Sequence, residues 1–176
     1  GGAPRWGVVD GGQGPGVSYS HRAVRVPVEV DGLLGDVGNQ FVRPRVLVNN
    51  AGIVTGEPSQ EFSTEDWRQQ VDVMLSGTFY ATRAAARRML GSGGGAVVSL
   101  SSIGGFAGHP GRSAYNAAKA GISCLTPVLG SECAERGVPV HAGAPAVTRT
   151  AVPEPALPPR HAPPRPPAHA APAPRG

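Results

Sequence analysis

Long apolar runs are missing from this chain, and aromatic residues are sparse. The longest apolar stretches, such as Ala96-Val97-Val98, are far shorter than the roughly 20 residues of a membrane-spanning helix, so we expect no membrane segment. Aromatic residues make up 5% of the sequence, which leaves few rings to stack on bases. Nucleic-acid binding is therefore not expected, and only the pI of about 9.7, with a net charge of +4, speaks for it.

Cysteine is also scarce: Cys124 and Cys133 lie nine positions apart on a predicted helix. That spacing is about 13 Å of helical rise, whereas the Cα atoms of a disulfide lie at most about 7 Å apart. Two reduced thiols are typical of a cytoplasmic protein, and we expect both to fill the core. No basic-then-apolar leader is recognisable, so a soluble cytoplasmic protein is predicted.

The chain divides into three regions of different composition. Residues 1–45 are Gly-rich, with no convincing helix pattern, and residues 46–150 alternate strand-like and helix-like segments. Residues 151–176 hold ten of the 19 prolines, mixed with alanine and arginine. Such a tail buries too little apolar surface to offset its ordering entropy. We assign residues 1–150 to one domain and residues 151–176 to a disordered tail.

Strand and helix signals alternate through the middle region. Apolar residues recur at three- and four-residue steps after Thr64, which we expect to cap a helix, and Gly137 is expected to end a second helix. Strands alternating with long helices predict a parallel sheet with right-handed crossovers. The predicted fold is α/β, a doubly wound, Rossmann-like parallel sheet that is incomplete at both ends. Its elements are strands at 46–50, 96–100 and 138–142 and helices at 64–90 and 113–136.

Polar or Gly-rich segments follow each predicted strand. They are residues 49–52 (Asn-Asn-Ala-Gly), the pair Ser101-Ser102, and the stretch from Pro145 to Thr150. Ligands of parallel α/β sheets bind beyond the carboxyl ends of the strands. The three segments therefore predict one site at a single edge of the sheet.

Tyr115 and Lys119 are the residues best suited to chemistry, because a spacing of four places both on one helical face. A free tyrosine titrates near pH 10, and a neighbouring ammonium favours its ionised form. Ser102, on the preceding loop, is placed to hydrogen-bond a substrate oxygen. Lys119 is the only lysine beside 15 arginines, which indicates a requirement for lysine itself. An ordinary surface Tyr–Lys pair is the alternative.

These motifs together resemble the short-chain dehydrogenase/reductase family over residues 45–150. The resemblance rests on residues 47–52 (LVNNAG), on the Tyr115-x-x-x-Lys119 motif with Ser102 thirteen residues earlier, and on residues 145–150. It implies that Ser102 positions the substrate, that Tyr115 is the acid/base, and that Lys119 holds the nicotinamide ribose. It also places Asn50, Thr148 and Thr150 against the cofactor.

The same resemblance implies NAD or NADP as cofactor and a small carbonyl or alcohol as substrate, with no metal. Family members usually pair through two long helices, so a homo-oligomer is expected through the faces 67–89 and 117–129. Two alternatives remain open. In the first, the chain is a catalytically impaired family member that acts as a binding or interaction protein. In the second, the arginines of the tail bind acidic partners (Arg160, Arg165, Arg175).

Residues 9–16 (VDGGQGPG) resemble the family's phosphate-binding loop, shortened by one residue. Gly11, Gly14 and Gly16 would let the backbone approach a pyrophosphate, but Asp10 adds a negative charge and Pro15 removes an N–H. A plain Gly-rich turn is an equal alternative. About 35 residues lie between Gly14 and Asn49, which leaves room for one crossover instead of two. Part of the dinucleotide half is therefore expected to be missing, and Asp31 and Asp36 are left open as its adenosine-contacting remnant.

Four further positions depart from the family pattern. Met74 replaces an asparagine, so we expect it to hold neither the helix kink nor the relay water associated with that amide. Pro127 is expected to kink the second helix, at a cost of about 3 kcal/mol. His141 replaces an asparagine, and Ala146 replaces a glycine. His141 has no partner at metal-ligand spacing, so we expect it to be structural.

Overall fold

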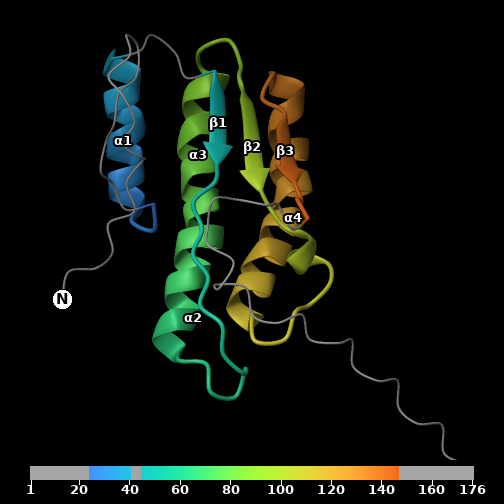
Figure 1. Ribbon diagram of the computed structural model, residues 1–176. Helices are drawn as coiled ribbons and strands as arrows, with labels where there is room; N and C mark the ends of the chain where they lie inside the picture. The colour runs from blue at the N-terminus through green and yellow to red at the C-terminus, as the bar shows by residue number, and fades with distance from the viewer. Residues whose placement is uncertain (1–23, 41–44, 147–176) are drawn as a thin grey trace, which may run out of the picture. The chain divides into compact units, whose positions relative to one another are not determined.

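The structure is a computed structural model that describes residues 24–40 and 45–146, with side chains described outside 36–40. Helices and strands alternate along it (Figure 1). The helices are α1 (Pro27–Gln40), α2 (Thr64–Val71), α3 (Gly77–Leu90) and α4 (Ser113–Cys133), and the strands are β1 (Val46–Asn49), β2 (Ala96–Leu100) and β3 (Val140–Gly143). Short helical turns occupy Asp72–Ser76 (π), Ile103–Gly105 (3-10) and Ala134–Arg136 (3-10).

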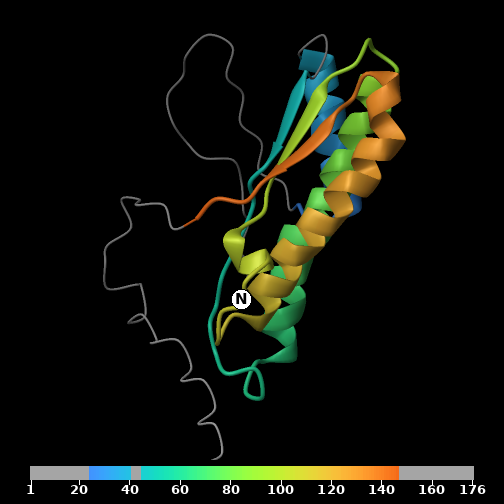
Figure 2. The same ribbon diagram turned by 90° about the vertical axis from the view of Figure 1, so that its right-hand side faces the viewer.

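The three strands form a parallel sheet in the order β1-β2-β3. Val98 of β2 is the register partner of Val48 on one side and of His141 on the other. Helices α3 and α4 cover one face of this sheet (Figure 2). The prediction of a parallel α/β sheet is therefore confirmed, and the carboxyl ends of all three strands lie at the same edge.

The main core lies between the sheet and the helices. Its largest fully buried side chains include Met89 of α3 and Val97 of β2. A second, smaller cluster contains Met74, Ala118 and Ile122, with Leu75 and Tyr115 packed against it. This second cluster lies beneath the residue that sequence analysis selected as acid/base.

The helical region begins at Thr64 as predicted, but its cap lies one residue earlier. Ser63, not Thr64, is the N-cap, and its hydroxyl oxygen accepts a hydrogen bond of 2.9 Å from the backbone N–H of Asp66. The prediction that Thr64 caps the helix is wrong because Ser63 has the extended backbone that places a side-chain oxygen over the first turn (φ −66°, ψ 144°).

Helix α1 was missed by sequence analysis. Its glycines, such as Gly32 and Gly35, lower its intrinsic helix propensity, so the pattern was not recognised. Two apolar residues, Val30 and Leu34, are buried in the main core, and Arg88 of α3 donates a hydrogen bond of 3.3 Å to the carbonyl of Asp31. Packing against α3 therefore stabilises a helix that its sequence favours only weakly.

Pro127 does not interrupt α4, which continues to Cys133. Gly137 ends the helical region with a left-handed backbone (φ 82°), as expected. The third strand begins at Val140 instead of Val138. Val138 is nevertheless fully buried, and its N–H binds the carbonyl of Cys133 at 3.1 Å. It serves the core without being part of the strand.

No helix among the described residues is long and apolar enough to cross a membrane. Several predicted features lie outside the part of the chain that the structure describes. They are the glycine loop with Gly11, Gly14 and Gly16, the cofactor contacts Thr148 and Thr150, and the tail 151–176.

Candidate active site

The two serines at the end of β2 have different environments. Side chains alternate along a strand, and Val97, Ser99 and Ser101 are buried, whereas Ser102 is half-buried. The Ser101 hydroxyl is bonded inside the protein, to the carbonyl of Lys119 at 2.8 Å. Ser102 is therefore the serine that remains accessible to a ligand.

The Ser102 hydroxyl caps the 3-10 turn that follows it. Its oxygen accepts a hydrogen bond of 3.1 Å from the backbone N–H of Gly104. This bond uses a lone pair and leaves the hydroxyl proton available. A Cβ on Gly104 would lie 2.9 Å from Oδ1 of Asn116, so the turn packs closely against the start of α4. Ser102 is thus held beside the helix that carries Tyr115 and Lys119.

Tyr115 and Lys119 are brought together on α4. Nζ of Lys119 lies 5.7 Å from the centroid of the Tyr115 ring. The lysine is 6% exposed, and its ammonium donates a hydrogen bond of 2.6 Å to the main-chain carbonyl of Leu100. Burial lowers the pKa of the Lys119 amine below its usual value. Lys119 is therefore buried beside a half-buried Tyr115, and the surface alternative is wrong for Lys119.

Met74 belongs to the small apolar cluster against which Tyr115 packs. The helix is irregular at this position, because the π-helical turn Asp72–Ser76 surrounds Met74 and the N–H of Gly77 binds the carbonyl of Asp72. The Thr78 hydroxyl donates to the carbonyl of Met74 at 2.6 Å. The side chain of Met74 does not hold this irregularity, as expected, but main-chain and threonine bonds maintain it without a side-chain amide. Met74 itself is fully buried in the small apolar cluster.

The two asparagines at the end of β1 have different environments. Asn49 donates hydrogen bonds to the hydroxyls of Thr82 (2.9 Å) and Ser99 (3.1 Å), so it joins β1 to α3 and β2. Asn50 is exposed where the strand ends. Sequence analysis selected Asn50 and missed the structural role of Asn49. The inward direction of alternate strand residues was the signal that could have separated them.

His141 and Ala146 are both exposed. The structure thus places Ser102, Tyr115 and Lys119 on neighbouring elements, with Asn50 at the same edge of the sheet.

The sequence model of the family described as short chain dehydrogenase matches residues 13–159. The chain belongs to the short chain dehydrogenase family. A curated relative, the 3-oxoacyl-(acyl-carrier-protein) reductase of Synechocystis sp., is 39% identical over 126 residues, which cover 72% of this chain and 51% of the relative. The chain spans about half the length of the curated relatives it matches.

Solved structures agree with this family assignment. A short chain dehydrogenase from Mycobacterium smegmatis is 35% identical, with a TM-score of 0.68 over 72% of this chain and 53% of that chain. An NAD+-bound xylitol dehydrogenase is 26% identical, with a TM-score of 0.70 over 72% of this chain and 49% of that chain. The Rossmann-like class of the fold is therefore shown.

Proposed function

We propose that this short chain dehydrogenase is an NAD(P)-dependent oxidoreductase that interconverts a small carbonyl compound and an alcohol. The observation that carries the proposal is the buried ammonium of Lys119, 5.7 Å from the ring centroid of Tyr115, on the helix against which the turn after Ser102 packs. In this proposal Tyr115 is the acid/base, Ser102 binds the substrate oxygen, and Lys119 binds the cofactor ribose.

The proton chemistry follows from the hydrogen-bond capacity of these groups. The hydroxyl proton of Ser102 is free to donate to a carbonyl oxygen, because its oxygen already accepts from Gly104. The phenol of Tyr115 then gives its proton to that oxygen as hydride reaches the carbonyl carbon, so a C–H and an O–H bond form. The ammonium of Lys119 stabilises the phenolate that remains. The reverse sequence oxidises the alcohol.

The described residues suit the nicotinamide end of a dinucleotide, which would supply the hydride when bound. The Lys119 ammonium has three N–H donors, and one binds Leu100. Its remaining donors can serve two vicinal ribose hydroxyls. Asn50 offers an exposed amide at the same edge. On the family resemblance alone, we also propose Thr148, Thr150, Gly11, Gly14 and Gly16 as cofactor-binding residues; all five lie outside the described residues.

Two experiments on the full chain test this function in order. The first measures binding of NADH or NADPH by quenching of tryptophan fluorescence. If neither dinucleotide binds at millimolar concentration, the proposed oxidoreductase activity is refuted. Tyr115→Phe should then keep dinucleotide affinity and lose about 10²–10⁴-fold in carbonyl-dependent NAD(P)H oxidation, the usual contribution of a general acid. Simple ketones and 3-oxoacyl thioesters are suitable probes. Unchanged turnover in the mutant would remove Tyr115 from the mechanism.

The alternative of an interaction protein without turnover has less support. The relatives named above all carry enzyme names.

The two described cysteines are free thiols, which agrees with a cytoplasmic location as part of the proposal. Cys133 is buried, as expected, but Cys124 is exposed. The expectation that both fill the core is wrong for Cys124, because it faces a groove between two helices.

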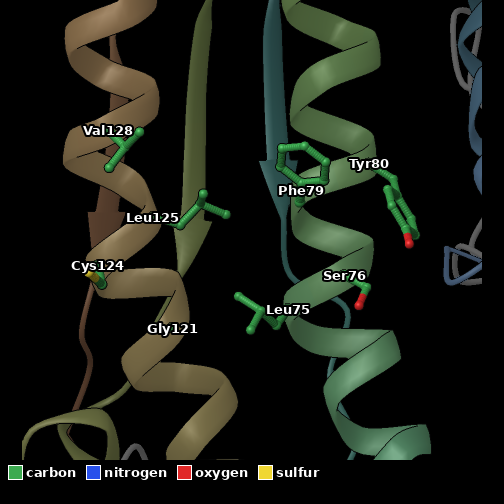
Figure 3. Close-up of a pocket in the computed structure, with 8 residues that line it drawn as sticks. All are labelled: Leu75, Ser76, Phe79, Tyr80, Gly121, Cys124, Leu125 and Val128. Carbon is green, nitrogen blue, oxygen red and sulfur yellow. The ribbon is translucent and has the colours of Figure 1, made fainter.

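We also propose that a second copy of this chain occupies that groove. The groove encloses about 620 Å³ and opens on the side of the helices away from the strands (Figure 3). It is lined mainly by apolar side chains from α3 and the π-helical turn and from α4: Leu75, Ser76, Phe79, Tyr80, Gly121, Cys124, Leu125 and Val128. When the same surface of a second copy covers this groove, its apolar side chains are removed from water, which favours the dimer.

Charge complementarity favours a copy of the same chain. Asp72 of the π-helical turn and Arg83 of α3 lie eleven residues apart, and each contacts a residue that lines the groove. Ser76 donates a hydrogen bond to Asp72 at 3.3 Å, and the Arg83 guanidinium lies 5.5 Å from the ring centroid of Phe79. In a two-fold contact with antiparallel helices, residue i meets j and j meets i. An axis at the middle of the groove brings Arg83 to the partner's Asp72 twice. Cys124 and Leu125 line the same groove as Leu75 and Phe79 (Figure 3), so a two-fold contact over the groove includes Cys124 of both copies.

Cross-linking tests this pairing directly. A short bis-maleimide should convert the protein to a covalent dimer through Cys124, and Cys124→Ser should abolish the product. Leu125→Glu should give a monomer, because it places a charge at the centre of the apolar contact. A strict monomer of the unmodified chain in light scattering at high concentration would refute the interface.

A further inference from the structure

Lys119 is attached to the end of β2 at both its main chain and its side chain. Its carbonyl accepts a hydrogen bond of 2.8 Å from the hydroxyl of Ser101, and its ammonium donates one of 2.6 Å to the carbonyl of Leu100. Leu100, Ser101 and Ser102 are consecutive. The position of the lysine is therefore tied to that of the serine proposed to bind substrate.

Ser123 completes this attachment from within α4. Its hydroxyl lies 2.6 Å from the Ser101 hydroxyl and 3.2 Å from the carbonyl of Lys119. Each hydroxyl has one proton, and a carbonyl oxygen has two lone pairs. One serine therefore donates to the carbonyl of Lys119 while the two hydroxyls bond each other. Ser101 is 2% exposed, so its hydroxyl has no route to a substrate and acts only inside the fold.

A lysine side chain has four rotatable bonds, and ordering it is costly in entropy. The main chain that carries it must be fixed for the ammonium to stay beside Tyr115. The turn before α4 contributes steric restraint, since a Cβ on Gly105 would lie 2.8 Å from the carbonyl carbon of Lys119. The two serines contribute the directional bonds. We propose that Ser101 and Ser123 are positioning residues for Lys119, fixing the turn of α4 that holds its ammonium between Leu100 and Tyr115.

The consequence for catalysis rests on the proposed function, but the positioning itself has a readout that needs no ligand. Lys119 is the only lysine of the chain. Protein labelled with [6-13C]lysine therefore gives a single ε-carbon signal, whose titration by NMR reports the ionisation of this amine. Burial lowers its pKa, so release of the side chain into water should raise the titration midpoint.

The variants are Ser101→Ala and Ser123→Ala in the full chain, with Ser131→Ala as matched control. Ser131 also lies on α4, but it is exposed and its hydroxyl binds the carbonyl of Val128 at 2.8 Å. We expect the midpoint to rise in Ser101→Ala, to rise less in Ser123→Ala, and not to change in the control. Ser123→Thr keeps the hydroxyl and should restore the original midpoint.

Dinucleotide affinity provides the second measurement. Ser101→Ala should weaken it about fivefold, the equivalent of one hydrogen bond. If the midpoint rises but no variant or parent binds a dinucleotide, the positioning stands and the proposed function fails. Titration in folded Ser101→Ala that matches the control overturns the inference. Should Ser101→Ala not fold, the half-buried Ser123 takes its place, and an unchanged midpoint in Ser123→Ala overturns the inference equally.

Discussion

Replacing Asn49 or Asn50 by alanine, one at a time, should affect different properties of the protein: the stability of the sheet for Asn49 and ligand binding for Asn50. Asn49 and Asn50 are chemically identical and neighbours in sequence. Among the described residues, the side chain of Asn49 bonds the hydroxyls of Thr82 and Ser99, two residues that are 1% and 2% exposed, whereas Asn50 is exposed. Asn49→Ala removes both bonds and leaves two buried hydroxyls short of a donor.

The size of the effect follows from those two bonds. At about 1 kcal/mol for each hydrogen bond, Asn49→Ala should lower the free energy of unfolding by about 2 kcal/mol. With an m-value of about 2 kcal/mol per molar urea, the midpoint of unfolding falls by about 1 M. Asn50→Ala should leave the midpoint in place, because that side chain is exposed, and should weaken dinucleotide binding.

Urea unfolding followed by far-UV circular dichroism measures both variants under the same conditions. An equal loss of stability in both variants would refute the distinction between the inward and outward asparagine. A shift below about 0.2 M in Asn49→Ala would show that the two bonds contribute nothing net.

Three further results are expected. Burial lowers the pKa of Lys119, so between that lowered value and about 10.4 the unfolded chain binds more protons than the folded chain. The free energy of unfolding therefore rises with pH across that window. Lys119→Met should lose this part of the rise, measured by thermal unfolding from neutral to alkaline pH. Gly94→Ala should destabilise the fold more than Gly137→Ala, for which we expect a cost of about 1 kcal/mol. Both glycines have positive φ, but a Cβ on Gly94 would lie 2.6 Å from the Gly137 carbonyl oxygen, and equal shifts in Tm would contradict this. Cys124 should react with a thiol reagent in the native protein and Cys133 only after unfolding. Fast reaction of both thiols in the native protein would refute the burial of Cys133.

Sequence patterns were sufficient where the physical cause is local. The spacing of Tyr115 and Lys119 is one helical turn, so their shared face was predictable without any tertiary information. The alternation of strand and helix signals between Val46 and Ala142 likewise determined a parallel sheet, because such strands need crossover connections. The family resemblance followed from the same short motifs.

Local patterns failed where packing decides. Helix α1 has a weak intrinsic preference and depends on burial of Val30 and Leu34 against α3. The helical irregularity around Met74 is held by the Thr78 hydroxyl and the main chain, which no rule about side chain 74 would predict.

The sequence by itself thus determined the fold class, the order of the strands along the chain, and the pairing of a phenol with an amine. Only the tertiary structure decided that the amine is buried against the carbonyl of Leu100 and that Ser101 faces inward while Ser102 stays accessible. The reason is physical: helix spacing and strand alternation act between near neighbours in sequence, whereas burial and hydrogen-bond partners depend on segments that meet only when the chain folds.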